Sequence, residues 1–178
     1  AARGAIVGVA DRDADGVAQT TAQVAAAGGV AHGYPIDVSR RDALLAAVAD
    51  LRSRTGRLDA IVASAMWIRY EPVEDIRDDT IDGMMAVGLK SVLWCAQAAL
   101  QGMDAERGGA LVAFASPVAD RGHRGTAVYT AVKGGVAALT RQMAMEFAPR
   151  RIRVNAVTPG STPTPGAHAV VTEAGWET

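Results

Sequence analysis

The stretch Ser116–Gly160, SPVADRGHRGTAVYTAVKGGVAALTRQMAMEFAPRRIRVNAVTPG, decides how the rest of the chain is interpreted. Tyr129 and Lys133 stand four residues apart in it, so on a helix they lie one turn apart on the same face. Ser116 precedes Tyr129 and directly follows the apolar run 110–115. A phenol, an ammonium group and a hydroxyl that converge on one point make a proton-transfer site. The Tyr–Lys pair alone would also fit an ordinary contact between neighbouring turns of a surface helix.

A wider match accompanies this pair. Ser116, Tyr129, Lys133 and the run 153–160, RVNAVTPG, resemble the short-chain dehydrogenase/reductase family, and the similarity covers nearly the whole chain. The resemblance implies an α/β fold with a Rossmann-like, doubly wound parallel sheet in a three-layer α/β/α arrangement. It also implies an enzyme that interconverts a secondary alcohol and a ketone by hydride transfer, with NAD as the expected cofactor and NADP as the alternative.

Composition restricts the class of protein. The 178 residues are one domain in size, 49% apolar and only 4% aromatic, with a formal net charge of −1. Acidic and basic residues are interspersed, which argues against a nucleic-acid partner. The single cysteine, Cys95, fits a reducing cytoplasm, and no apolar run or signal peptide indicates a membrane protein. The three histidines show no ligand spacing, so no metal site is expected.

Short apolar runs alternate with helical patterns along the chain. The apolar runs predict five buried parallel strands, at 5–10, 30–36, 58–63, 110–115 and 152–157. The intervening stretches predict helices at about 15–27, 39–54, 80–103 and 125–147. Ser39 with Asp42 has the pattern of a capping box at the start of the second of these helices. This alternation predicts a parallel doubly wound sheet.

The part that should occupy the middle of such a sheet is missing. In the strand order 3-2-1-4-5-6 the first strand is central, and its turn carries the glycine-rich phosphate loop. Nothing before Asp11 matches a strand, a glycine-rich turn and a helix, and Ala1–Gly4 fits the end of a helix or a remnant of the glycine loop. We therefore expect residues 1–178 to form a single, partial dinucleotide-binding domain with its sheet split in two, unable to fold stably alone.

The resemblance gives Ser116, Tyr129 and Lys133 catalytic roles. Tyr129 would exchange a proton with the substrate oxygen, Ser116 would hydrogen-bond the same oxygen, and Lys133 would hold the nicotinamide ribose. An ammonium group beside a phenol favours the phenolate. The family's fourth catalytic position, an Asn that holds a relay water, is Gly88 in this chain. The alternative is therefore a degenerate family member with a binding or regulatory role and little or no catalysis.

Cofactor positions follow from the resemblance as well. Asp11 would accept hydrogen bonds from the adenosine ribose and repel a 2′-phosphate, which favours NAD; an ordinary strand-end carboxylate is the alternative. Asp37 would contact the adenine with Val38 packing on the ring, although a carboxylate near a helix N-terminus explains Asp37 equally well. The family's Asn-Asn-Ala-Gly is here Ala63-Ser64-Ala65-Met66. The remaining implied cofactor contacts are Ala63, Tyr129, Lys133, Pro159, Gly160 and Thr164.

Substrate and assembly are the least specified expectations. Residues 161–178, rich in Pro and Thr, resemble the mobile loop that covers a small carbonyl or alcohol substrate. The resemblance implies that the helices 80–103 and 125–147 form the interface of a homodimer or homotetramer. Trp67 and Trp94 are expected to serve packing rather than substrate binding.

Overall fold

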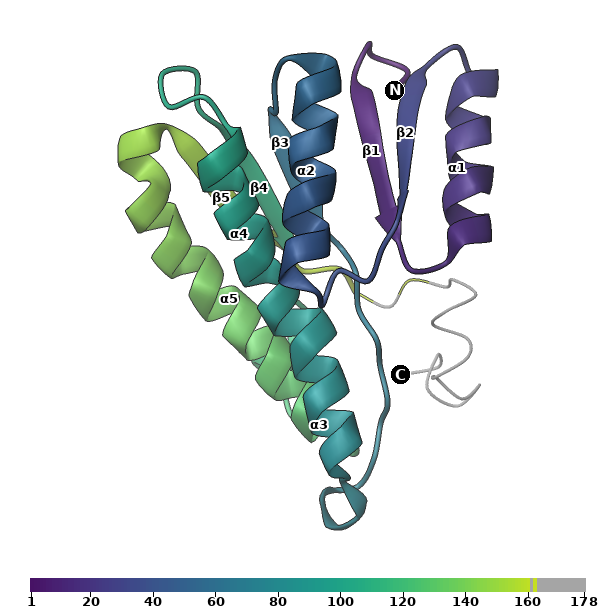
Figure 1. Ribbon diagram of the computed structural model, residues 1–178. Coiled ribbons are helices and arrows are strands. Elements are labelled where there is room, and N and C mark those ends of the chain that lie inside the picture. Colours follow the sequence, from purple (N-terminus) through teal and green to yellow (C-terminus); the bar gives the residue numbers. More distant parts are fainter. Residues whose placement is uncertain (161, 163–178) are drawn as a thin grey trace.

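The computed structural model describes residues 1–160 and 162 (Figure 1). The predicted cofactor residue Thr164, and all of the predicted substrate loop except Thr162, lie outside the described residues.

Five parallel strands form two separate sheets, and the bounds of all five lie within two residues of the prediction. They are β1 (Ile6–Asp11), β2 (Val30–Pro35), β3 (Ala60–Ala63), β4 (Gly109–Phe114) and β5 (Ile152–Val157). Strand β1 pairs with β2, and the second sheet has the order β3-β4-β5. Within the described residues β1 and β3 each pair on one side only. The predicted division of the sheet into two halves is therefore confirmed.

Burial differs sharply between the central strand β4 and the strands at the sheet edges, two of which border this division. Ile6 of β1 and Val62 of β3 are 45% and 58% exposed. Leu111 and Ala113 of β4, which has a strand on either side, are fully buried. Apolar strand residues at the division thus remain in contact with water, at a cost of about 25 cal/mol for each Å² of apolar surface left exposed.

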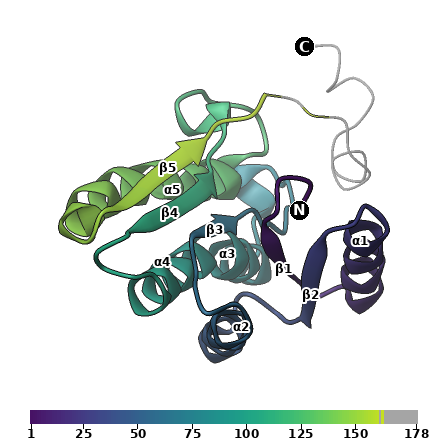
Figure 2. The ribbon, with the colours of Figure 1, turned by 90° about the horizontal axis from the view of Figure 1, so that it is seen from above.

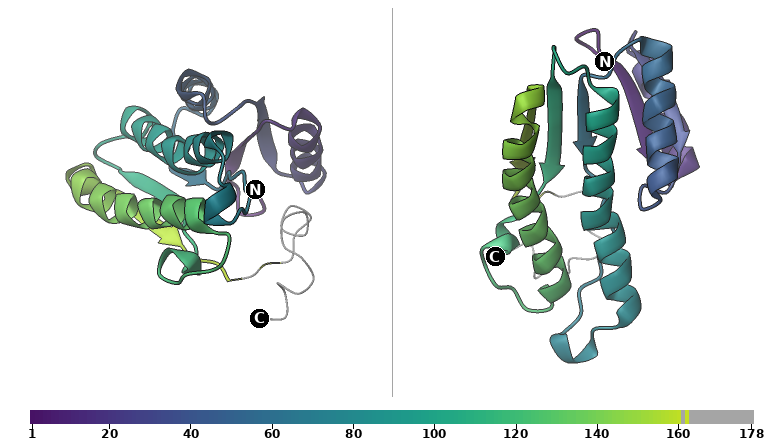
Figure 3. Two further views of the ribbon diagram at one scale, coloured as in Figure 1. Left: turned by 90° about the horizontal axis from the view of Figure 1, so that it is seen from below. Right: turned by 60° about the vertical axis from the view of Figure 1, so that its left-hand side comes forward.

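Helices pack on both sides of the first sheet and on one side of the second. Their bounds are α1 (Ala14–Ala26), α2 (Arg41–Thr55), α3 (Asp78–Met85), α4 (Ser91–Gly102) and α5 (Ala127–Phe147). Figures 2 and 3 show α1 and α2 on opposite sides of the β1–β2 pair, with α4 and α5 beside β3, β4 and β5. Of the predicted three layers, the described residues supply all three only around the first sheet.

The main core lies between the second sheet and helices α4 and α5. Small side chains on α4 allow the helix to approach β3 and β4 closely, as the alanine-rich composition indicates. Larger apolar side chains of α5 complete the contact. The most deeply buried members are Ala98, Ala99, Leu111, Ala113, Val136 and Ile152.

The predicted helix 80–103 is interrupted. A π-helical turn, η2 (Ala86–Lys90), separates α3 from α4, and Gly88 lies buried at its centre. The whole helical run Asp78–Gly102 is long and apolar enough to cross a bilayer by length and composition, with a mean hydropathy of 1.3, although no apolar run in the sequence was expected to be. It contacts α2, α5, β3 and β4, as a core helix does.

Two predictions about helix ends are wrong. Helix α2 begins after Arg40, which makes no side-chain cap, and Ser39 instead donates its backbone N–H to Asp37 Oδ1 at 2.9 Å. The predicted capping box does not form, because the Ser39 N–H that Asp42 would accept is already hydrogen-bonded to the Asp37 side chain. Ala1–Gly4 form a turn closed by a 2.8 Å hydrogen bond from Gly4 N to Ala1 O, not the end of a helix.

Candidate active site

The predicted site residues lie at the carboxyl ends of the strands. Figure 3 shows the strands of both sheets running toward the same end of the molecule, so their carboxyl ends share one edge, where ligands bind in open α/β sheets. Asp11 and Ala63 are the last residues of β1 and β3, and Ser116 follows β4 by two residues. Pro159 follows β5, whose Val157 O accepts a 2.9 Å hydrogen bond from Ala115 N–H.

Ser116, Tyr129 and Lys133 are placed around the end of β4. Ser116 is buried and caps the short 3-10 helix η3 (Pro117–Ala119), which packs against α5. The Lys133 ammonium donates to Phe114 O at 2.6 Å, two residues before Ser116. Its Nζ also lies 5.6 Å from the centre of the Tyr129 ring. Lys133 therefore lies against the backbone of the strand end that leads into Ser116, with the Tyr129 ring next to it.

Lys133 is the most unusual charge in the described part of the chain. Lys133 is only 6% exposed, on the second turn of α5, and its neighbours Val132 and Val136 are also buried. Burial lowers the pKa of Lys133 to about 8, because the charged form loses its hydration. An ammonium held inside the protein with one short hydrogen bond is an arrangement that stability alone does not favour.

Tyr70 is a second phenol at this site, and no motif in the sequence points to it. Its ring lies edge to face with the Tyr129 ring, with centroids 5.7 Å apart and planes at 78°. Burial raises the pKa of Tyr70, and the negative charge on Tyr129 in its ionised form raises that pKa further. Aromatic pairs of this geometry contribute about 0.5–1.5 kcal/mol beyond their buried area.

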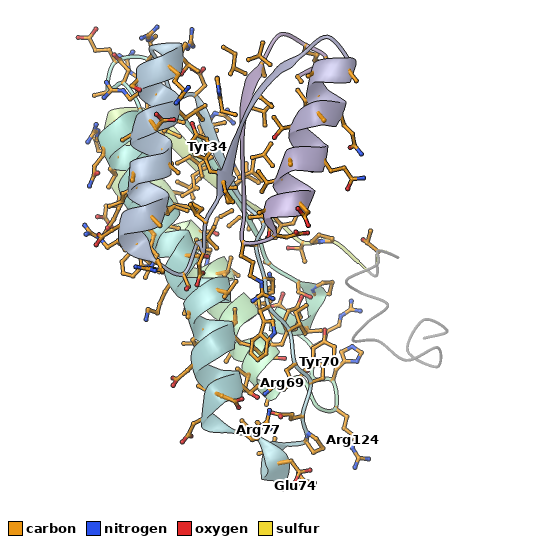
Figure 4. The ribbon with its side chains drawn as sticks, turned by 45° about the vertical axis from the view of Figure 1, so that its right-hand side comes forward. Tyr34, Arg69, Tyr70, Glu74, Arg77 and Arg124 are labelled. Atoms are coloured by element: carbon orange, nitrogen blue, oxygen red, sulfur yellow. The ribbon has the colours of Figure 1, made fainter. Side chains whose placement is uncertain are left out.

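The segment 66–71, which carries Tyr70, is held at several points. Arg69 ion-pairs with Asp79 at 3.0 Å on α3, and Glu71 N donates to Gly125 O at 3.0 Å. Figure 4 shows Arg69, Tyr70, Arg77 and Arg124 at the end of the molecule where α3 begins. The Tyr70 ring is therefore presented to Tyr129 by an ordered segment.

Comparison with known proteins agrees with this geometry. Residues 1–175 match the family model described as short chain dehydrogenase. The chain belongs to this family.

Its relatives include enzymes and one protein named as inactive. The chain is 35% identical over 165 residues to the short-chain reductase protein NovJ of Streptomyces niveus, covering 93% of this chain and 63% of the relative. It is 37% identical to an inactive 2-(S)-hydroxypropyl-CoM dehydrogenase 2 of Xanthobacter autotrophicus, covering 89% of this chain and 67% of the relative. The chain thus spans about two thirds of the length of these short-chain dehydrogenases.

Solved structures of the family have the same fold. A 7α-hydroxysteroid dehydrogenase in complex with NADH and 7-oxo glycochenodeoxycholic acid superposes with a TM-score of 0.92 at 25% identity, covering 98% of this chain and 68% of that protein. A gluconate 5-dehydrogenase from Burkholderia cenocepacia in complex with NADP and tartrate gives 0.87 at 27% identity, covering 94% of this chain and 66% of that protein. The family resemblance and the Rossmann-like fold are confirmed, and nicotinamide cofactors of both kinds occur among its neighbours.

The first sheet offers the acceptors that the adenosine half of such a cofactor needs. Asp11 and Asp37 are both exposed at the shared edge, and Ile36 N donates to Asp11 O at 2.9 Å. Each carboxylate accepts a backbone N–H through Oδ1, from Asp13 and Ser39 respectively, which leaves its Oδ2 for a ligand. Hydrogen bonds from Ser39 lower the pKa of Asp37, so its carboxylate stays charged. These residues fit the ribose and adenine end of a dinucleotide.

Other predicted cofactor contacts are less exposed than Asp11 and Asp37 or follow a different strand. Val38 is half-buried against the main core, which limits its access to a ring. Gly160 and Pro159 follow β5 on the Ser116 side of the sheet.

In the described residues, no group of three or more His, Cys, Asp or Glu side chains could hold a metal ion.

A cavity of about 450 Å³ borders the catalytic helix. It lies between the segment 72–74 and the loop 122–127, and Thr130 of α5 contributes to its wall. His123 and Arg124 line it and are exposed. These side chains precede the turn of α5 that carries Tyr129.

Proposed function

We propose that the protein is an NAD(H)-dependent oxidoreductase that interconverts a secondary alcohol and a ketone. The observation that carries the proposal is the buried ammonium of Lys133, hydrogen-bonded at the end of β4 and 5.6 Å from the Tyr129 ring. Ser116 follows the same strand end. Family membership supports the reaction class.

Each residue has a defined task in this reaction. A bound nicotinamide supplies or accepts the hydride. In the reductive direction Tyr129 donates its phenolic proton to the carbonyl oxygen, and Ser116 donates a hydrogen bond to that oxygen and orients it. The ammonium of Lys133 favours the phenolate that Tyr129 becomes. Among the described residues Lys133 Nζ has one hydrogen-bond partner, so it retains donors for the ribose hydroxyls of the cofactor.

The preference for NAD rests on Asp11. A carboxylate at the end of β1 accepts hydrogen bonds from ribose hydroxyls and repels a 2′-phosphate. Arg12 next to it would attract such a phosphate, which weakens the preference for NAD over NADP without reversing it. Measured dissociation constants for NADH and NADPH test this point directly, and tighter binding of NADPH would refute it.

Exchanging Tyr129 for Phe tests the reaction mechanism. The variant keeps the ring, and hence the contact with Tyr70, but loses the exchangeable proton. We expect turnover of secondary alcohols, followed at the absorbance of NADH, to fall by at least about 100-fold while NADH binding is retained. A Tyr129→Phe protein with normal turnover would exclude the mechanism.

A second candidate function is cofactor binding without catalysis. Gly88 supports it, because no side chain at this position can hold a relay water, and so does the similarity to a relative named as inactive. Saturable NADH binding together with the absence of turnover across a panel of secondary alcohols would favour this candidate. Both candidates require the cofactor site, so a protein that binds neither NADH nor NADPH contradicts both.

We also propose that the protein assembles through its long helices. Ile81 of α3 and Met145 of α5 are 42% and 79% exposed, although both are apolar. Leu93 of α4 is also exposed. Burying such side chains against a second copy would remove them from water. Light scattering coupled to size exclusion tests the proposal, and a monomer at micromolar concentration would refute it.

A further inference from the structure

Met66 and Gly88, two of the positions at which the chain departs from its family's pattern, are in contact. A Cβ built on Gly88 would lie 2.6 Å from Met66 Sδ and 2.6 Å from Val132 Cγ1, both far inside van der Waals contact. The missing side chain on the π-helical turn therefore leaves a notch, and the thioether of Met66 fills it against Val132. Val132 is fully buried and, being β-branched on a helix, has one strongly preferred rotamer.

A second notch lies one and a half turns earlier on the same helical run. A Cβ on Gly83 of α3 would lie 2.7 Å from Cζ3 of Trp67, whose ring packs there. The guanidinium of Arg69 stacks over that ring, 4.8 Å from its centre, and pairs with Asp79. Met66 and Trp67, which are adjacent in the segment 66–71, thus pack into the notches at Gly88 of η2 and Gly83 of α3.

Tyr70 follows these anchors directly. We propose that Met66 is a positioning residue: by filling the notch at Gly88 it locks the segment 66–71 onto the helix and holds the Tyr70 ring edge to face with Tyr129. Relative to the family's pattern, the helix loses a side chain at position 88 and the loop gains one at position 66. The two exchanges are then one coupled change of packing, because the Met66 side chain fills the volume that Gly88 leaves. The proposal rests on the proposed function only where it names Tyr129 as the proton donor. The packing of Met66 at Gly88, and with it the position of Tyr70, does not depend on that function.

Two readouts that need no turnover test the proposal. The first is a cycle of melting temperatures with Gly88→Ala, Met66→Ala and the double variant. We expect Gly88→Ala to lower Tm by about 4 °C or more, because its Cβ overlaps two side chains, and to lower it by less than half as much when Met66 is already Ala. Gly134→Ala is the matched control, since a Cβ on this glycine of α5 meets nothing within 4 Å and should raise Tm slightly.

The second readout is the nuclear Overhauser effect between the ring protons of Tyr70 and Tyr129. Centroids 5.7 Å apart bring ring edges close enough for a strong signal. Met66→Ala should weaken this signal at least several-fold, and Met66→Leu, which keeps the volume, should restore it. If Gly88→Ala does not fold, the Met66 variants carry the test alone.

The two readouts separate positioning from simple packing. An unchanged Tyr70–Tyr129 signal in Met66→Ala, accompanied by a lower Tm, would show that Met66 only fills space. Additive Tm changes in the cycle would show that positions 66 and 88 are independent. Either outcome overturns the proposal, and neither bears on whether the protein transfers hydride.

Discussion

Replacing Lys133 by Met should stabilise the protein at neutral pH. Burial lowers the pKa of Lys133 from 10.5 to about 8, and this difference corresponds to roughly 3.4 kcal/mol at 1.36 kcal/mol per pKa unit. The variant also loses the 2.6 Å hydrogen bond to Phe114 O, which is worth about 1.5 kcal/mol. The net gain in the free energy of unfolding at pH 7 is therefore expected to be about 2 kcal/mol.

The pH dependence of this gain identifies its cause. Between pH 8 and 10.5 the unfolded chain binds the Lys133 proton more strongly than the folded chain, so the native protein becomes more stable as the pH rises. Below pH 8 the whole cost of the buried charge is present, and above 10.5 it is gone. The advantage of Lys133→Met should thus be constant up to about pH 8, shrink above it, and become a disadvantage of about 1.5 kcal/mol by about pH 10.5, where only the lost hydrogen bond counts.

Urea unfolding of the two proteins at several pH values measures the effect. Taking the difference cancels contributions from other titrating groups, Tyr70 included. Lys90 is exposed and is the other lysine of the chain, so Lys90→Met is the matched control and should show no such pattern. A Lys133→Met variant that is less stable than the parent at pH 7, by an amount independent of pH, would refute the reasoning.

Three further outcomes are expected. Asp11→Ser should lower the ratio of the dissociation constants of NADPH and NADH at least about 10-fold, since it removes the charge that repels a 2′-phosphate. The same ratio in the parent and the variant would contradict this role of Asp11. Tyr70→Ala should raise KM for a ketone substrate more than it lowers kcat, whereas Tyr70→Phe should change neither, because the ring rather than the hydroxyl contacts Tyr129. Gly108→Ala should cost at least about 2 kcal/mol of unfolding free energy by urea titration, because Gly108 has φ +72° and its Cβ would overlap Arg151 O; a smaller loss would mean that the turn adapts.

The order of strands and helices was predictable from the sequence because local patterns determine it. Five short apolar runs between helical stretches became five parallel strands, and the division of the sheet followed from a first strand that the pattern did not contain. The spacing of Tyr129 and Lys133 predicted a shared helix face, and on α5 the Lys133 ammonium lies near the Tyr129 ring and donates to Phe114 O.

What the sequence did not predict depends on contacts between distant residues. Met66 and Gly88 are 22 positions apart, and no periodicity links a loop methionine to a helix glycine. The edge-to-face contact of Tyr70 with Tyr129 joins residues that lie even farther apart, 59 positions in the chain. The π-helical turn replaced a continuous helix for which the propensities of the residues gave no warning. Tertiary packing decided all three.

Transfer of a deuteride is the most direct test of the proposed reaction. The protein is mixed with NAD and with 2-propanol or cyclohexanol deuterated at the carbinol carbon, and the reduced cofactor is analysed by mass spectrometry. We predict deuterium in the NADH formed by the parent chain and none with Tyr129→Phe. Cofactor binding without label transfer from either alcohol, or equal transfer by both proteins, would contradict the assignment of Tyr129 as the proton-transfer residue of an NAD(H)-dependent oxidoreductase.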